Sequence, residues 1–249
     1  QIKRSIFYII LLFILFVVLF PVYWLLATSF KHPVQYYTDP PTFIPNPLVI
    51  DHYTFAHGYE SGVAAQTSLK GGDWIRPFIN STIIASISTV LSVLVGCLAA
   101  FSLASYKIKG GGGIALWILS LRVIPPAALI VPYYVMMSSW ALTDNPLALI
   151  ITYVLFNLPL ATWLMMGFFK EIPEEIEESS MVDGCSRLSS FIRISLPIVL
   201  PGIVATAVFC FVTAWNEFLF AFVLTRTDAA RTIAVFMGTF FDEQGIMWG

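Results

Sequence analysis

Long uncharged runs constrain this chain more than any other feature of its sequence. Residues 5–30 and residues 77–106 contain no Asp, Glu, Lys or Arg. A helix needs about 20 apolar residues to cross about 30 Å of hydrocarbon, so each run is long enough to span a membrane. Three more apolar segments follow, at 114–142, 146–169 and 198–224. The sequence therefore predicts a polytopic membrane protein with five visible spans.

Composition agrees with this prediction. Hydrophobic residues make up 58% of the 249 residues and charged residues only 11%, against about 25% charged residues in a soluble domain. The formal net charge of −2 argues against nucleic acid as a partner. Cys97, Cys185 and Cys210 are far apart in the sequence and fit neither a disulfide framework nor a metal-binding spacing, so we predict structural thiols. The apolar core of a signal peptide has about 7–15 residues. The run at 5–30 is longer, so we predict a helix that is retained in the mature protein.

Basic residues indicate how the spans are oriented. If five spans alternate, one side of the membrane receives Lys3, Arg4, Lys107, Lys109, Lys170, Arg187 and Arg193. The short loop at 143–145 lies on the other side and has no basic residue. By the positive-inside rule the first side is cytoplasmic. We therefore expect the N-terminus and the 170–197 loop in the cytoplasm, and the 31–76 loop and the 225–249 segment outside.

The loop between the fourth and fifth spans has the pattern of two short helices joined by a sharp turn. Pro173 suits a first helical position, and the glutamates within 174–178 occupy first turns, where the helix dipole favours negative charge. Gly184 favours the left-handed conformation that ends a helix. Ser186 suits the cap of a second helix, which leads back to the membrane at Pro197. We expect a helix–turn–helix on the membrane surface.

The same stretch resembles the EAA loop of ABC importer permeases. The family pattern is E-A-A-x-x-D-G-A, nine residues, then I-x-L-P, and this chain matches it by type and spacing at Glu178, Asp183, Gly184, Ile194, Leu196 and Pro197. Ser179, Ser180 and Cys185 stand where the family has alanines, and all three are small. The resemblance implies that these nine residues dock in a cleft of an ATPase subunit and transmit its opening and closing.

The resemblance extends over most of the chain. Ile124-Pro-Pro, Asn157-Leu-Pro and Trp215-Asn-Glu look like the carbohydrate-type importers with separate binding proteins. It implies an all-α fold, the membrane helical bundle of an ABC type I importer permease, formed by residues 1–249 as a single transmembrane domain of a prokaryotic inner membrane. The implied substrate is a sugar, oligosaccharide or polyol.

Partners and cofactors follow from the same resemblance. It implies a second permease, usually non-identical, two ATPase subunits and an extracytoplasmic substrate-binding protein. ATP and Mg are expected in the partner ATPase, and no cofactor, metal ion or catalytic residue is expected in this chain. Permeases of this type also have a sixth span, whereas the uncharged stretch at 232–241 is too short to be one. We therefore expect the natural protein to continue past Gly249 with another apolar segment and a short basic cytoplasmic tail.

Polar residues inside two spans are candidates for a substrate pathway. Arg122 lies just before a Pro-Pro pair, which breaks a helix. Arg122 either lines the pathway or lies near the membrane edge with its charged end reaching water. In the fifth span, Asn216 and Glu217 offer donors and acceptors for sugar hydroxyls, and Trp215 and the phenylalanines after it lie beside them. The alternative is that this aromatic stripe packs against lipid or other helices.

Four other hypotheses have weaker support. Asp51, His52, His57 and Glu60 suggest a metal site, but nothing fixes their geometry, and an external loop with short helices is expected there. The four glycines at 110–113 lack the Lys-Ser/Thr of a phosphate loop. An ion-coupled secondary transporter or channel is the alternative function, with Arg122 and Glu217 as coupling charges. A membrane-embedded enzyme would need a nucleophile, base or metal set, and the histidines are confined to one loop.

Overall fold

The computed structural model describes residues 2–56, 74–106, 108, 110–238, 241–242 and 245–246. These residues fall into two compact units, one made of residues 1–75 with 239–249 and the other of residues 76–238. Each unit is described by itself.

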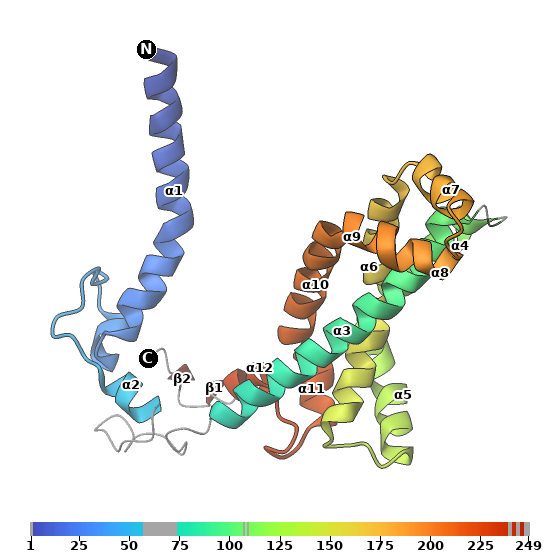
Figure 1. Ribbon diagram of the computed structural model, residues 1–249. Helices are drawn as coiled ribbons and strands as arrows, with labels where there is room; N and C mark the ends of the chain where they lie inside the picture. Colours follow the sequence, from blue (N-terminus) through green and yellow to red (C-terminus); the bar gives the residue numbers. More distant parts are fainter. Residues whose placement is uncertain are drawn as a thin grey trace. The chain divides into compact units, whose positions relative to one another are not determined.

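The first unit is built on one long helix, α1 (Ile2–Ser29), drawn in dark blue in Figure 1. Its 28 residues rise about 42 Å, which exceeds the thickness of the hydrocarbon core. Apolar side chains are exposed along its length, as a helix surrounded by lipid or by another chain requires. The short helices η1 (Pro33–Tyr37) and α2 (Asp51–Ala56) follow. The strands β1 (Phe241–Asp242) and β2 (Gly245–Ile246) pair antiparallel.

The second unit is organised by α3 (Ile75–Ser105), α6 (Pro146–Lys170) and α10 (Leu200–Trp215). Small residues bring α3 and α6 together, because a Cβ at Gly96 would lie only 2.8 Å from the Cβ of Ala161. Close approach at small residues is typical of helices packed in membranes. The helix α10 packs against α6, and the ring of Phe168 covers Gly202 at the start of α10.

The predicted break at the Pro-Pro pair is present. The helix α4 (Gly111–Ser120) continues into the 3-10 turn η3 (Leu121–Val123), and α5 (Pro126–Ser139) begins at the second proline. The two parts are bent by 86°. Pro125 has an extended backbone, as favoured for a residue that precedes a proline.

The remaining helices come before and after α10 in the sequence. Before it come α7 (Glu174–Val182), α8 (Arg187–Ser190), the π-helical segment η4 (Phe191–Ser195) and α9 (Leu196–Ile198). After it come α11 (Leu219–Leu224) and α12 (Ile233–Gly238). The stretch 198–224, expected as one span, is therefore divided at residues 216–218. The run from Arg187 to Ile198 is bent by 76° from α10.

Three helices in the described residues are long and apolar enough to cross a membrane: Arg4–Ser29, Ile75–Ser105 and Pro146–Lys170. Counting each bent pair as one span raises the number to five. Apart from the two-residue strands, the described elements are helical. The predicted all-α, polytopic membrane fold is confirmed.

Candidate functional site

The stretch singled out by its sequence pattern forms a helical hairpin, α7 and α8, near the C-terminal end of α3 (Figure 1). Pro173 takes the N-cap position, one residue before the predicted position, and α7 starts at Glu174. Its first turn carries Glu174, Glu175 and Glu177, where negative charge complements the helix dipole. The shape is the one that the sequence predicted.

The turn of this hairpin depends on Gly184, whose φ of 87° lies in the left-handed region. The Cys185 N–H donates to the Ser180 carbonyl over 3.0 Å, and the Gly184 N–H donates to the Met181 carbonyl over 3.1 Å. This pair of bonds is the Schellman motif, which satisfies the free carbonyls at a helix end. The Ser186 hydroxyl then accepts from the Ser189 N–H and caps α8, as predicted.

Small side chains hold the two arms of the hairpin together. The Ser180 hydroxyl donates to the Ser190 hydroxyl over 2.7 Å, and both residues are buried. The small size of Ser180 therefore lets the chain's own second arm approach, whereas the neighbouring Ser179 is exposed. Of these two motif serines, only Ser179 is therefore exposed to an outside surface.

A carboxylate ties the root of the hairpin to α3. Glu177 Oε1 accepts hydrogen bonds from the Ser105 hydroxyl at 2.8 Å and from the Ser195 hydroxyl at 3.5 Å. The Arg187 guanidinium lies over the ring of Tyr106, at 4.8 Å from its centroid, a favourable cation–π arrangement. The sequence pattern does not distinguish Glu177 from the glutamates beside it, because an inward-facing carboxylate can be recognised only once its partners are placed.

Three aromatic rings complete the root. Phe191 of η4 lies 4.7 Å from Phe101 of α3 and 6.1 Å from Phe169 of α6, measured between ring centroids. Phe101 and Phe169 are 5.6 Å apart in an edge-to-face arrangement. All three are buried. Aromatic pairs of this kind stabilise packing beyond the area that they bury, so the hairpin is fixed to two of the long helices.

The remaining residues of the sequence motif lie on the outer face of the hairpin and in η4 and α9, which follow it. Glu178, Ser179, Asp183 and Gly184 are exposed, Cys185, Ile194 and Leu196 are partly exposed, and Pro197 is exposed. Apolar side chains on the same hairpin also reach solvent, with Val182 87% and Leu188 63% exposed. Exposed apolar side chains grouped with charges mark contact surfaces between proteins.

Glu217 lies in the break between α10 and α11, where its carboxylate is fully engaged. Its Oε1 accepts from the Phe220 N–H at 2.9 Å, and its Oε2 accepts from the Ala221 N–H at 3.1 Å and from the Tyr153 hydroxyl at 3.0 Å. The carboxylate thus satisfies backbone groups that the broken helix would leave without partners. The role of Tyr153 as a hydrogen-bond donor to Glu217 was not predicted. The sequence indicated only that a carboxylate within a membrane span needs some donor.

The other proposed pathway residues lie near breaks but do not form one cluster of hydrogen bonds. Asn216 is exposed, and its amide donates to the Val212 carbonyl of its own helix at 2.8 Å. Trp215 packs edge-on against Phe78, with ring centroids 5.5 Å apart. Arg122 is exposed in η3 and makes no hydrogen bond or ion pair with any residue in the described part of the chain.

A second polar cluster closes the opposite end of the unit. Asp144, in the turn between α5 and α6, accepts from the backbone N–H groups of Arg226 at 2.8 Å and Thr227 at 2.9 Å, and from the Thr227 hydroxyl. Partial burial works to raise the pKa of the Asp144 carboxyl, but these bonds and the Arg226 charge outweigh it and hold that pKa below its usual range. Asn80 of α3 donates to the Arg231 carbonyl at 3.0 Å in the same loop. The long helix α3 therefore contacts both polar ends of the unit.

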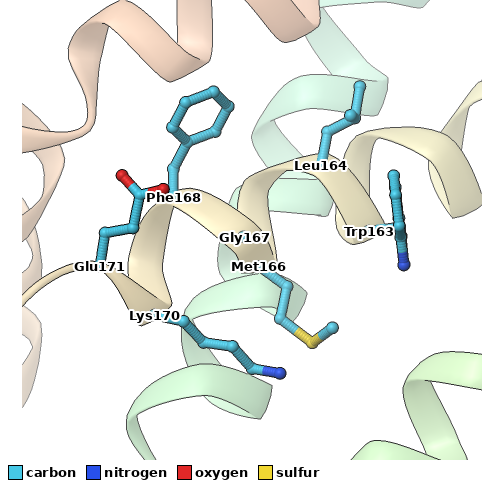
Figure 2. Close-up of a pocket in the computed structure, with 7 residues that line it drawn as sticks. All are labelled: Trp163, Leu164, Met166, Gly167, Phe168, Lys170 and Glu171. Atoms are coloured by element: carbon cyan, nitrogen blue, oxygen red, sulfur yellow. The ribbon is translucent and has the colours of Figure 1, made fainter.

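One concavity of the second unit lies beside the hairpin and has about 80 Å³. Another of about 390 Å³ lies along the last turns of α6 and is lined by Trp163, Leu164, Met166, Gly167, Phe168, Lys170 and Glu171 (Figure 2). Figure 2 shows Met166 and Lys170 on one side of this helix and Phe168 on the other. Among the described residues, no three His, Cys, Asp or Glu side chains are grouped to hold a metal ion. His57 and Glu60 lie outside the described residues.

Comparison with known proteins finds similar chains. Residues 92–244 match the family model described as binding-protein-dependent transport system inner membrane component. The chain is 38% identical to the probable ABC transporter permease protein y4oR of Sinorhizobium fredii, over 94% of this chain and 79% of that protein. It is 31% identical to the trehalose/maltose transport system permease protein MalG of Thermococcus litoralis, over 93% and 79% of the two chains.

A solved structure has the same fold. It is the crystal structure of a bacterial ABC transporter involved in the import of the acidic polysaccharide alginate. One of its chains matches with a TM-score of 0.70 and 19% identity, over 98% of this chain and 83% of that chain. At this identity the match supports the fold alone.

Proposed function

This chain belongs to the family of inner membrane components of binding-protein-dependent transport systems, and from that premise we propose how its parts act in import. It is a multi-pass permease subunit of an ABC importer and not itself an ATPase. ATP hydrolysis resides in a separate partner, and a substrate-binding protein belongs to the same system. The family that the sequence motif predicted is confirmed.

The proposed substrate is a sugar, oligosaccharide or polyol. This proposal is supported by the relative from Thermococcus litoralis, whose name states trehalose and maltose. The break at residues 216–218 supplies polar groups within an otherwise apolar segment, with Trp215 and Phe218 beside them. Polar groups within spans mark substrate pathways, and we propose Trp215, Asn216, Glu217 and Arg122 as residues near that pathway.

The proposed coupling element is the α7–α8 hairpin, which docks on the ATPase. The observation that carries this proposal is the division of the hairpin into a fixed root and an exposed outer face. The root is held by Glu177 and Phe191, whereas Glu178, Val182 and Leu188 point outward. Because its root is fixed to α3 and α6, the hairpin passes a movement of the ATPase cleft from its exposed outer face to these two helices.

The proposed assembly contains a second, non-identical permease, two ATPase subunits and an external binding protein. The N-terminus and the hairpin lie in the cytoplasm in this arrangement, because the basic residues of the short loops group on that side. ATP and Mg are held by the partner ATPase. An ion-coupled transporter is less favoured, because the Glu217 carboxylate already accepts three hydrogen bonds within the chain.

A natural cysteine allows a direct test of the coupling proposal. Cys185 lies in the hairpin turn and is partly exposed, whereas Cys97 and Cys210 are buried. A short thiol-to-amine cross-linker added to the assembled complex should therefore join this chain to the ATPase through Cys185. The expected product is one covalent permease–ATPase pair whose yield changes when ATP is added.

Cys185→Ser is the matched control and should abolish the product without affecting assembly. Cross-linking of Cys185 to lipid or detergent only, in a complex that contains the ATPase and hydrolyses ATP, would contradict the docking proposal.

A further inference from the structure

A pocket of about 490 Å³ lies at the C-terminal end of α1, within the first unit. Its lining residues come from the last turns of α1 and from the segment that follows: Pro21, Trp24, Leu25, Thr28, Lys31, Tyr36 and Tyr37. Sites for small ligands have volumes of about 300–1,000 Å³, so the pocket has the size of a ligand site.

The cation in this pocket has no anionic partner. The Lys31 side chain is only 1% exposed, and its ammonium lies 3.9 Å from the centroid of the Trp24 ring. The Lys31 carbonyl accepts from the Tyr36 hydroxyl at 3.2 Å, which fixes the backbone beside the pocket. In the part of the chain that the structure describes, no carboxylate pairs with the ammonium. Burial of a cation is costly without a counter-charge.

A hydroxyl in the same pocket is also unpartnered. Thr28 Oγ1 is buried and has no hydrogen-bond partner among the residues that the structure describes, although a helical threonine ordinarily donates to a carbonyl one turn earlier. The Lys31 ammonium and the Thr28 hydroxyl therefore leave two donors of one small pocket available. An anionic group such as a phosphate has the acceptor oxygens that both require.

The position of the pocket along α1 matches the edge of a membrane. Arg4 and Trp24 are twenty residues apart on one helix, which corresponds to about 30 Å, the thickness of the hydrocarbon core. If Arg4 marks one interface, then Trp24, Tyr36 and Tyr37 lie at the other, where aromatic side chains collect. Pro21 and Leu25 line the pocket from the apolar side of this level.

We propose that this pocket binds an anionic phospholipid. The phosphate contacts the Lys31 ammonium and the Thr28 hydroxyl, the aromatic rings surround the headgroup, and an acyl chain follows Pro21 and Leu25. An anionic headgroup is favoured over a zwitterionic one, because none of the described lining residues has a carboxylate to receive a headgroup amine.

Native mass spectrometry of the detergent-purified importer complex tests this proposal. The complex is titrated with phosphatidylglycerol or with phosphatidylcholine of the same acyl chains, and the bound lipid is counted. Loss of one charge-assisted contact in Lys31→Gln should weaken phosphatidylglycerol binding about tenfold. Loss of the neutral hydroxyl in Thr28→Val should weaken it about threefold. Phosphatidylcholine should bind more weakly than phosphatidylglycerol to the unchanged protein, and both substitutions should weaken it as well, because its phosphate has the same acceptor oxygens.

Two further variants distinguish binding at this pocket from binding elsewhere on the protein, and the charge of Lys31 from its packing. Lys170→Gln removes a cation of the second unit and should leave the high-affinity phosphatidylglycerol in place. Lys31→Arg keeps the charge and should retain most of the binding. If Lys31→Gln fails to assemble, Thr28→Val and Lys31→Arg carry the test.

Equal phosphatidylglycerol binding by Lys31→Gln and the unchanged protein would overturn the proposal. So would Lys31→Arg losing as much binding as Lys31→Gln, because only packing would then matter. Displacement of phosphatidylglycerol by millimolar glycerol 3-phosphate would show that the ligand is a soluble phosphoester and not a membrane lipid, which also overturns it.

Discussion

The Tyr153 hydroxyl donates a 3.0 Å hydrogen bond to Glu217 Oε2 and so joins α6 to the break between α10 and α11. The same carboxylate caps α11 through the Phe220 and Ala221 N–H groups. A broken helix in a membrane protein needs such partners for its free backbone groups. Glu217 therefore has a structural task in the described chain, whatever contact it makes with substrate.

Glu217→Ala should destabilise the protein by about 2–4 kcal/mol, because two buried N–H groups and one hydroxyl lose their acceptor. Glu217→Gln keeps one acceptor oxygen and should cost about half as much. Thermal unfolding of the purified complex measures both effects. If Glu217→Ala is as stable as the unchanged protein yet transports nothing, the carboxylate acts on substrate and not as a helix cap.

Tyr153→Phe isolates the cross-helix bond. In the protein that keeps Glu217, this substitution should lower the free energy of unfolding by about 1.5–3 kcal/mol, as expected for loss of a hydrogen bond to a charged group. Its effect should be smaller in the Glu217→Gln background, and the difference measures the coupling between the two side chains. Strictly additive effects would mean that the 3.0 Å contact contributes nothing.

Gly184 gives a prediction about coupling. Because its φ is 87°, Gly184→Val should strain the turn by about 1–2 kcal/mol or more and misdirect α8. We expect transport to be lost while the protein remains in the membrane. Gly184→Asn should retain part of the transport, since asparagine tolerates the left-handed region. Gly113→Ala, at a position with open space around it, is the control, and substrate uptake in vesicles is the measurement.

The sequence was a good guide where local chemistry decides the structure. The Schellman turn at Gly184, the Ser186 cap and the break at the Pro-Pro pair depend on neighbouring residues, and all three are present. The apolar runs likewise located the long helices, because their length and lack of charge leave few alternatives.

Features that depend on tertiary packing were not predictable in this way. Glu177 and Glu178 are neighbours of identical chemistry, yet Ser105 and Ser195 reach one of them and leave the other exposed. The division of the 198–224 stretch at Glu217 likewise requires Tyr153, which lies 64 residues earlier. No local pattern contains either partner.

Packing of α3 on α6 gives a fourth prediction. A Cβ at Gly96 would meet the Ala161 Cβ at 2.8 Å and backbone atoms of α6 at 3.1 Å and 3.2 Å. Gly96→Ala should therefore push the helices apart and destabilise the protein by about 1–3 kcal/mol. Gly167→Ala is a matched control, because nothing lies within 4 Å of its new Cβ. It should be neutral, or stabilising by up to about 1 kcal/mol through helix propensity. Equal melting temperatures for the two variants would refute the close packing.

Asp144 gives a prediction about pH. Its folded-state pKa is lowered from the usual range, so the stabilisation by its carboxylate is present above the unfolded-state pKa and is lost as the pH falls through the folded-state pKa. At pH 7, Asp144→Asn should have a lower melting temperature than the unchanged protein. Its free energy of unfolding should fall by about 1–2 kcal/mol, because the hydrogen bonds to Thr227 and Arg226 are weakened. The difference in melting temperature between Asp144→Asn and the unchanged protein should become smaller only below about pH 4. If this difference in melting temperature disappears already near neutral pH, the pH dependence of stability comes from another titratable group.

The two adjacent glutamates of α7 provide the sharpest test of the coupling hairpin. Glu177→Ala removes the acceptor for Ser105 and should destabilise the root by about 1–2 kcal/mol. Glu178→Ala should leave stability unchanged, because that side chain is exposed, but it should weaken retention of the ATPase. Glu178→Lys should weaken retention further, by about tenfold, if the ATPase presents a complementary positive surface. Co-purification of the ATPase and thermal unfolding are measured on the same samples. Loss of ATPase from Glu177→Ala alone, with both Glu178 variants normal, would mean that the partner contacts a different face of the hairpin.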